Sequence, residues 1–239
     1  MKVSSARGLL LDIGGVVLRG GSGIAAMLAE EVPPVRDEAA RLGVATAGDA
    51  LWRRMLSGQV SERQYWATRA ADLGRAVGEV WDTRAFINRL YDRPSWQLLN
   101  QEVVALMVQA RQSGIPVVAL TNDLVNFHGQ PWVDRQRWLR HFDTIVDGSL
   151  TGILKPDPRA FAAGIAAVGL PAAQIVYLDD MPWNVAGGIA AGLQTVEVDG
   201  ADPGPAAALT RSLLGLGGGP NPEHALPTAE HTASRSRVE

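Results

Sequence analysis

The sequence lacks several features that would mark particular classes of protein. Its 239 residues contain no cysteine, which excludes disulfides, thiolate metal sites and a cysteine nucleophile. Basic charge is not in excess either, because 22 lysine and arginine residues stand against 25 acidic residues and give a net charge of −3. A protein that binds nucleic acid through phosphate contacts would favour a basic balance, so no nucleic-acid partner is expected.

Long apolar runs are missing as well. The first one, Gly8 to Leu11, ends at Asp12, which makes it too short for the hydrophobic region of a signal peptide. No stretch of about 18 uninterrupted apolar residues occurs, so the sequence predicts neither a membrane span nor a membrane partner. We therefore expect a cytoplasmic protein. The sequence predicts no particular oligomeric state.

Five short apolar runs have the form of parallel strands that are buried on both faces. They are Leu9–Leu11, Ile115–Leu120, Thr144–Val146, Gln174–Leu178 and Gln194–Val198. Helical stretches separate several of them, at Gln101–Ser113, Pro158–Val168 and Asn184–Ala191, and each is followed by a glycine. This alternation predicts an α/β fold, a Rossmann-like doubly wound parallel sheet with helices on both faces.

The region between the first two of these strands has a different pattern, with helical candidates and no strand-like run. The candidates are Met27–Glu31, Arg36–Leu42, Ala50–Leu56, Glu62–Leu73 and Thr83–Leu90. We predict an all-helical cap at 19–95, whose core contains Trp52, Trp66 and Trp81 as packing residues. The arginines of the cap, at positions 53, 54 and 69, are candidates for substrate contacts, but they are preferably interpreted as solvated charges.

The cap divides the rest of the chain into two parts of one core. We predict that 1–18 and 96–216 form this core. Residues 217–239 lack apolar periodicity and are rich in proline, serine, threonine and charge, so they are predicted to be a disordered tail.

The strand ends carry residues that suit chemistry. Ligands of a doubly wound sheet bind outside the carboxyl ends of its strands, where this sequence has Asp12, Thr121-Asn122-Asp123 and Asp179-Asp180. Lys155 lies just before a helix that begins with proline. A carboxylate can attack phosphorus, while a threonine hydroxyl, backbone N–H groups and an ammonium group can hold phosphoryl oxygens.

The acidic residues at this edge also predict a cation. Asp12, Asp179 and Asp180 would repel one another if they met without one. Carboxylate oxygens and water suit Mg²⁺, which typically uses one or two carboxylates together with a substrate phosphate. A lone aspartate at a strand end is most often a cap or turn residue, but the order and placement of the whole set favour a phosphoryl site with Mg²⁺.

The order Asp, Thr, Lys, Asp-Asp on this layout resembles the haloacid dehalogenase superfamily, in its subclass with a helical cap after the first strand. The stretches LLLDIGGVVL, VVALTND, GILKPDPRAF and IVYLDDMPWNVAGGIAAGLQTV are similar to the four motifs of the family in sequence. The resemblance implies a Mg²⁺-dependent phosphatase that acts on a small phosphate ester, with sugar phosphates among the candidates.

The resemblance implies a role for each matching residue. Asp12 would be the nucleophile and form an aspartyl-phosphate. Thr121 and the backbone of Asn122 would bind the phosphoryl oxygens, and Lys155 would steady the charge on nucleophile and phosphate.

The same resemblance implies a set of metal ligands. Asp12 and Asp180 would ligate Mg²⁺ directly, Asp179 would ligate it or hold its waters, and Asn184 would orient the acidic pair. The backbone carbonyl of Gly14 would be a further ligand.

Gly14 departs from the family's pattern. Phosphatases of this kind usually carry a second aspartate two residues after the nucleophile, as general acid and base, and here that position is glycine. General acid–base help is commonly worth roughly 10²–10⁴-fold. A substitute acid would come from the cap, from Asp123 or from a group of the substrate; without one the enzyme would be slow or inert. His128, on the loop after Thr121, either faces the pocket or is a surface or turn residue, and the second interpretation is preferred.

Other functions stay open at this point. A catalytically quiet binding or regulatory domain would keep the fold and a phosphate pocket, and Gly14 is the feature in its favour. A 2-haloacid dehalogenase would use Asp12 against carbon without a metal, but the tyrosine and threonine of that branch are missing around Gly14. A phosphotransferase would differ mainly in passing the phosphoryl group to a hydroxyl instead of water.

Overall fold

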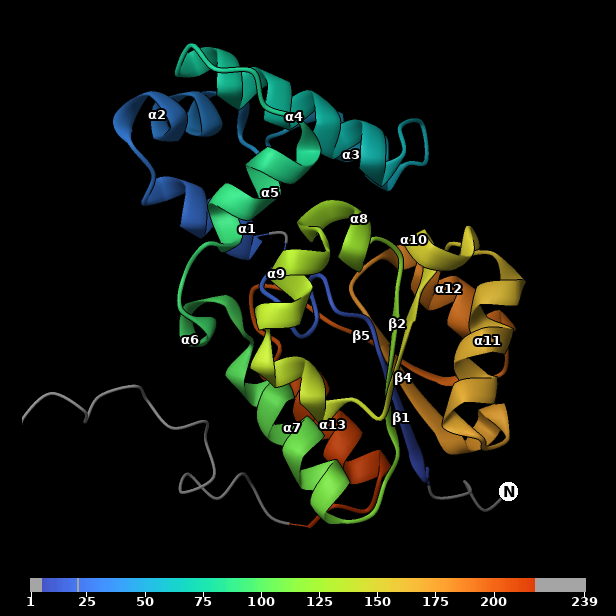
Figure 1. Ribbon diagram of the computed structural model, residues 1–239. Helices are drawn as coiled ribbons and strands as arrows, with labels where there is room; N and C mark the ends of the chain where they lie inside the picture. Colours follow the sequence, from blue (N-terminus) through green and yellow to red (C-terminus); the bar gives the residue numbers. More distant parts are fainter. Residues whose placement is uncertain (1–5, 21, 218–239) are drawn as a thin grey trace, which may run out of the picture.

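The computed structural model describes residues 6–20 and 22–217 (Figure 1). At its centre lies a sheet of five parallel strands in the order β3-β2-β1-β4-β5. The strands are β1 (Gly8–Leu11), β2 (Val117–Thr121), β3 (Thr144–Asp147), β4 (Ile175–Asp179) and β5 (Gln194–Glu197). Every residue of β1, β2 and β4 is buried, as their uninterrupted apolar runs predict for strands covered on both faces.

Helices cover both faces of the sheet, which confirms the predicted α/β fold. On one face lie α11 (Pro158–Val168) and α12 (Pro182–Ala190), and on the other lie α7 (Gln101–Gln112) and α13 (Gly204–Leu213) (Figure 1). Shorter segments connect these elements: α8 (Leu124–His128), α9 (Gln130–Arg135), α10 (Gly148–Thr151) and the 3-10 turns η1 (Arg137–His141) and η2 (Ala172–Gln174). None of the described helices combines the length and the apolar character that a bilayer crossing requires.

The predicted helical insertion after the first strand is confirmed. It comprises α1 (Ser22–Ala29), α2 (Pro33–Leu42), α3 (Ala50–Leu56), α4 (Glu62–Ala76) and α5 (Thr83–Tyr91), after which α6 (Ser95–Leu98) leads into α7. Figure 1 shows α1 to α5 as a separate layer above the end of the sheet where α8 lies. The limits given above for core and cap stay predictions. Of the predicted tail, 218–239 lies outside the described residues.

The cap has its own core, built on tryptophans as predicted. Trp52, Trp66 and Trp81 are buried, and Tyr65 packs edge-on between the first two, with ring centroids 5.1 and 4.8 Å away. The interpretation of Arg69 as a solvated charge is wrong. Its guanidinium is buried against Asp49, and the fully buried carboxylate of Asp49 also caps the N-terminus of α3. A buried carboxylate needs a counter-charge.

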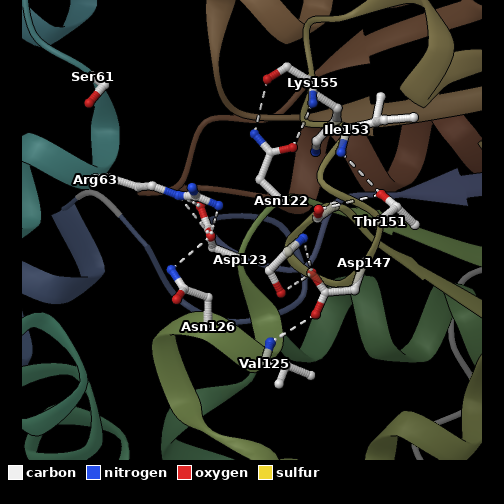
Figure 2. Close-up of polar contacts among 12 residues, drawn as sticks. Ser61, Arg63, Asn122, Asp123, Val125, Asn126, Asp147, Thr151, Ile153 and Lys155 are labelled. Carbon is white, nitrogen blue, oxygen red and sulfur yellow. Dashed lines mark hydrogen bonds and ion pairs between the residues drawn. The ribbon is translucent and has the colours of Figure 1, made fainter.

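Polar contacts hold the cap against the core. The guanidinium of Arg63 in α4 pairs with Asp123 after β2 at 2.6 Å, as Figure 2 shows. Arg84 in α5 donates two hydrogen bonds, of 3.1 and 3.2 Å, to the backbone oxygen of Asn126 in α8. The cap therefore lies directly over the carboxyl ends of the strands.

Candidate active site

Parallel pairing brings the predicted acidic residues together. In the ladder between β1 and β4, Leu11 stands opposite Leu178, and the backbone N–H of Asp12 donates to the oxygen of Leu178 at 2.9 Å. The next residues in register are therefore Asp12 and Asp179. Carboxylate oxygens of Asp12, Asp179 and Asp180 lie within 4.8 Å of one another, the one such group found among the described residues.

Lys155 lies between two of these carboxylates. Its ammonium Nζ is 2.6 Å from Asp179 Oδ2 and 3.1 Å from Asp12 Oδ1, and its side chain is almost fully buried. Burial works against the charged form of this lysine, but the charges of Asp12 and Asp179 outweigh it and raise its pKa. Lys155 therefore stays an ammonium group at neutral pH and places positive charge beside the predicted nucleophile.

Asp12 itself is only 8% exposed at the end of β1. Burial raises its pKa to about 7, with the charge of Asp179 adding to the effect, while Lys155 and the backbone N–H of Ile13 oppose it. That N–H donates to Asp12 Oδ1 at 2.7 Å. These two donors both contact Oδ1, so the described residues place no donor on Oδ2.

Asp179 has both of its oxygens engaged within the protein. Oδ2 accepts from Lys155 Nζ and from the hydroxyl of Tyr177. Oδ1 accepts from the backbone N–H of Met181 at 2.9 Å and from Asn184 Nδ2 at 3.1 Å. Asn184 therefore orients the first member of the acidic pair, in agreement with the prediction. With four donors around it, Asp179 ties β4, α12 and Lys155 into one arrangement.

Asp180, in contrast to Asp179, is incompletely hydrogen-bonded. Its Oδ1 is buried and has no hydrogen-bond partner, and Asn184 Oδ1 shares that condition. Burial, together with the charges of Asp179, Asp12 and Glu62, raises the pKa of Asp180 well above its usual range. Gly15 leaves the room for this carboxylate, because it has a φ of +75° and a Cβ there would fall 1.9 Å from Asp180 Oδ2.

The donor set fits a hard divalent cation. Buried polar atoms without partners are rare in folded proteins because each costs free energy. Asp180 Oδ1 and Asn184 Oδ1 are two such atoms, and both residues line one pocket with Asp12 and Gly14. A Mg²⁺ ion with its waters uses oxygen ligands of this kind and would offset the crowded negative charge.

The remaining predicted residues lie around the same pocket. Thr121, at the end of β2, and Asn122 line it, while Gly14 contributes backbone. The side chain of Asn122 also has a role that the sequence did not indicate. Its Oδ1 accepts from the Lys155 backbone N–H at 2.7 Å and its Nδ2 donates to the Lys155 backbone oxygen at 3.1 Å, the paired bonds drawn in Figure 2. Asn122 thus fixes the segment that delivers Lys155.

The cap supplies the upper wall of the pocket. The residues of helices α1 to α5 that line the pocket are Ile24, Trp52, Glu62, Trp66, Ile87 and Tyr91. His128 belongs to the core and also lines the pocket. Its interpretation as a surface residue is therefore wrong. The imidazole is 7% exposed and stacks on Trp132 with ring centroids 3.9 Å apart. Sequence reasoning did not predict α8 and α9, so it did not indicate that Trp132 stacks on His128.

Sequence reasoning missed two residues of the site and one interaction between predicted residues. Tyr177 is one, and its signal was its place two residues before Asp179 on a strand, where both side chains point to the same face. The pairing of Asn122 with Lys155 had no local signal. Glu62 had only its position at the start of a predicted helix, because its approach to Asp12 depends on how the cap packs.

A model of the haloacid dehalogenase-like hydrolase family matches residues 6–192 of this chain. Among curated proteins, acyl-CoA dehydrogenase family member 10 of Mus musculus is 25% identical over 154 residues, which cover 62% of this chain and 14% of that protein. Phosphoserine phosphatase of Thermus thermophilus is 26% identical over 166 residues, which cover 64% of each. The chain therefore spans less than two thirds of the length of these two relatives.

Solved structures of the same architecture agree with the fold. The HAD-hydrolase YfnB from Bacillus subtilis, bound to magnesium, is 20% identical with a TM-score of 0.57, and the match covers 82% of this chain and 87% of that one. The L-2-haloacid dehalogenase RSc1362 is 21% identical with a TM-score of 0.53 and the same two shares. At these identities the likeness is one of fold.

Proposed function

Because this chain belongs to the haloacid dehalogenase-like hydrolase family, we propose that it is a Mg²⁺-dependent phosphomonoester hydrolase that works through an aspartyl-phosphate at Asp12. The observation that carries the proposal is the cluster at the carboxyl ends of β1 and β4. There a buried lysine bridges Asp12 and Asp179, while Asp180 keeps a buried oxygen without a partner. Phosphoserine phosphatase of Thermus thermophilus, which is 26% identical to this chain, is a phosphatase by name, and this supports the reaction class.

The chain's own residues account for the covalent step. Asp12 attacks phosphorus with the carboxylate oxygen that accepts no hydrogen bond, and the bond between phosphorus and the ester oxygen breaks. The hydroxyl of Thr121 and the ammonium group of Lys155 hold the phosphoryl oxygens as charge moves onto them. Water then attacks phosphorus, the bond to Asp12 breaks, and inorganic phosphate leaves with the aspartate regenerated.

The metal would be held by Asp12 and Asp180, with the Gly14 carbonyl as a third ligand. We place Asp179 behind this set, since its oxygens already accept four hydrogen bonds from the protein. When bound, Mg²⁺ supplies positive charge that offsets the negative charge of the phosphoryl group and of the aspartates.

The pocket also favours one kind of alcohol in the ester. Four acidic residues line it, namely Asp12, Glu62, Asp123 and Asp180, and among the described lining residues there is no arginine or lysine. Its cap wall is apolar and aromatic, with Trp52 and Trp66 in it. A carboxylate or second phosphate on the alcohol would find no cation there, so we propose esters whose alcohol part is uncharged.

The test is phosphate release with Mg²⁺, comparing wild type with Asp12→Asn. The panel contains p-nitrophenyl phosphate, neutral alkyl and sugar phosphates, and carboxylate-bearing phosphoserine and phosphoglycolate. We expect release that Asp12→Asn abolishes, and preference for the neutral esters. A 2-chloro carboxylate, assayed for chloride, tests the dehalogenase alternative.

Two outcomes would overturn the proposal. Chloride release without phosphate release would make the protein a dehalogenase. No release from any substrate that depends on Asp12, together with tight binding of Mg²⁺ and of vanadate as a phosphate analogue, would identify a quiet binding domain.

A further inference from the structure

The proposed hydrolysis needs a proton for the departing alcohol, and the structure has an open space where the family's usual acid would stand. Gly14 lies in the pocket two residues after Asp12. A Cβ added at Gly14 would meet no other atom within 4 Å. The missing aspartate has therefore not been replaced by another side chain packed into its place, and the proton must come from elsewhere in the pocket.

Asp123 also lines the pocket, but its carboxylate already accepts hydrogen bonds from other residues. The guanidinium of Arg63 donates to both of its carboxylate oxygens, at 2.6, 3.0 and 3.1 Å, and Asn126 Nδ2 donates at 3.0 Å. Figure 2 shows this fork. Both oxygens of Asp123 are therefore occupied as acceptors, and the residue serves to hold the cap against the core.

The other titratable residues on the wall are equally unsuitable. His128 is stacked on Trp132 and its Nδ1 is buried without a partner. Burial lowers the pKa of His128 to about 3, so its ring carries no extra proton at neutral pH. The hydroxyl of Tyr91 donates to the backbone oxygen of Arg19 at 2.5 Å, and burial raises its pKa.

Glu62 remains, and its geometry suits the task. It is the first residue of α4, which begins with the capping box of Ser61 and Gln64, so its backbone position is fixed. The side chain is half-buried and lines the pocket with Asp12 and Gly14. Trp66 Nε1 donates to its Oε1 at 3.3 Å. Within the described part of the chain, Oε2 receives no hydrogen bond.

The surroundings of Glu62 favour its protonated form. Burial raises its pKa, and the charges of Asp123 and Asp179 add to this effect, whereas the Trp66 hydrogen bond and the charge of Lys155 oppose it. The charge of Glu62 in turn raises the pKa of Asp180. Glu62 thus shares the electrostatic environment of the acidic cluster although it belongs to the cap.

We propose that Glu62, delivered by the cap, is the general acid and base of this site in place of the aspartate missing at position 14. The proposal rests on the phosphatase function above. In the first step, the proton of the Glu62 carboxyl passes to the ester oxygen as its bond to phosphorus breaks, so a neutral alcohol leaves. In the second, the Glu62 carboxylate takes a proton from the water that attacks the aspartyl-phosphate, which returns Glu62 to its starting form.

The test is the first turnover of Glu62→Gln on two esters, by rapid mixing with Mg²⁺. An aryl ester such as p-nitrophenyl phosphate has a good leaving group and needs no acid, whereas an alkyl ester does. We expect release of p-nitrophenolate in the first turnover to stay within about threefold of wild type, followed by slow turnover as aspartyl-phosphate accumulates. First-turnover release from the alkyl ester should fall by roughly 10²–10⁴-fold.

Two further variants complete the design. Glu79→Gln is the matched control, because Glu79 Oε2 also accepts from a cap tryptophan, Trp81 Nε1 at 2.7 Å, but lies outside the pocket; it should behave as wild type on both esters. Gly14→Asp in the Glu62→Gln background places a carboxyl in the open space and should restore the alkyl ester at least about tenfold.

The outcomes separate the two proposals. If Glu62→Gln slows the first turnover of both esters equally and Gly14→Asp restores neither, Glu62 has a structural role and this proposal is overturned, while Asp12-dependent release leaves the phosphatase function intact. If wild type shows no release from the aryl ester that depends on Asp12, the phosphatase function fails. The proposed role of Glu62 then fails with it.

Discussion

Replacing His128 by phenylalanine should change how the stability of the protein depends on pH. The imidazole is 7% exposed, lies flat on Trp132 and meets Tyr91 edge-on with ring centroids 5.1 Å apart. Its Nδ1 has no hydrogen-bond partner, so a phenyl ring keeps the aromatic contacts without giving up a bond at that atom. What it removes is the ability to bind a proton.

The magnitude follows from the two pKa values of the histidine. Burial lowers the pKa of His128 to about 3 in the folded protein, against about 6.5 in an unfolded chain. Between these values the unfolded state binds a proton that the folded state does not, so stability is lost as the pH falls below 6.5. At about 1.4 kcal/mol per pH unit, the loss is about 2 kcal/mol by pH 5.

Urea denaturation at pH 7.5 and pH 5 measures this. The free energy of unfolding of wild type should fall by about 2 kcal/mol more than that of His128→Phe between the two pH values. Any change in the free energy of unfolding that the phenyl ring causes equally at both pH values cancels in this difference. So does the contribution of His141, whose pKa burial also lowers, because both proteins contain it. Equal losses in the two proteins would refute the reasoning and mean that His128 is protonated as readily in the fold as in the unfolded chain.

Two further predictions concern the metal and the cap. Asp180→Asn should raise the Mg²⁺ concentration needed for half-maximal phosphate release, and the Kd for Mg²⁺ in calorimetry, by more than about tenfold; unchanged values would remove Asp180 from the ligands. Asp49→Asn breaks the buried pair with Arg69 and should lower the free energy of unfolding by roughly 3–5 kcal/mol. Glu38→Gln, whose pair with Arg41 is on the surface, should cost less than about 1 kcal/mol in the same urea titration, and equal effects would contradict this account.

The fold was largely predictable because its signals are local. Strands of a parallel sheet covered on both faces need continuous apolar runs, and glycine ends helices because it adopts a positive φ without strain. Gly169, with a φ of +74°, closes α11 at the predicted residue. Sequence reasoning missed α13 (Gly204–Leu213), although its alanines favour a helix. Its packing against the sheet is a tertiary property.

The candidate site was predictable where a residue follows directly from a strand. Asp12, Thr121 and Asp179 were expected to meet because parallel strands bring their carboxyl ends to one edge, and each of them lines or adjoins the pocket. The metal-binding and catalytic roles of these residues stay predictions. What the pattern did not indicate was that Asp179 is saturated by four donors while Asp180 is left with a free oxygen.

The sheet, the helical insertion and the strand-end residues thus follow from local patterns, because apolar periodicity, glycine stops and the order of polar residues act over a few positions at a time. Which cap residues reach the site depends instead on tertiary packing. Glu62 lies 50 positions from Asp12 in the sequence, and its place in the pocket depends on how α4 docks on the core through Arg63 and Asp123. Contacts between distant segments follow from packing of whole surfaces, and no local pattern encodes them.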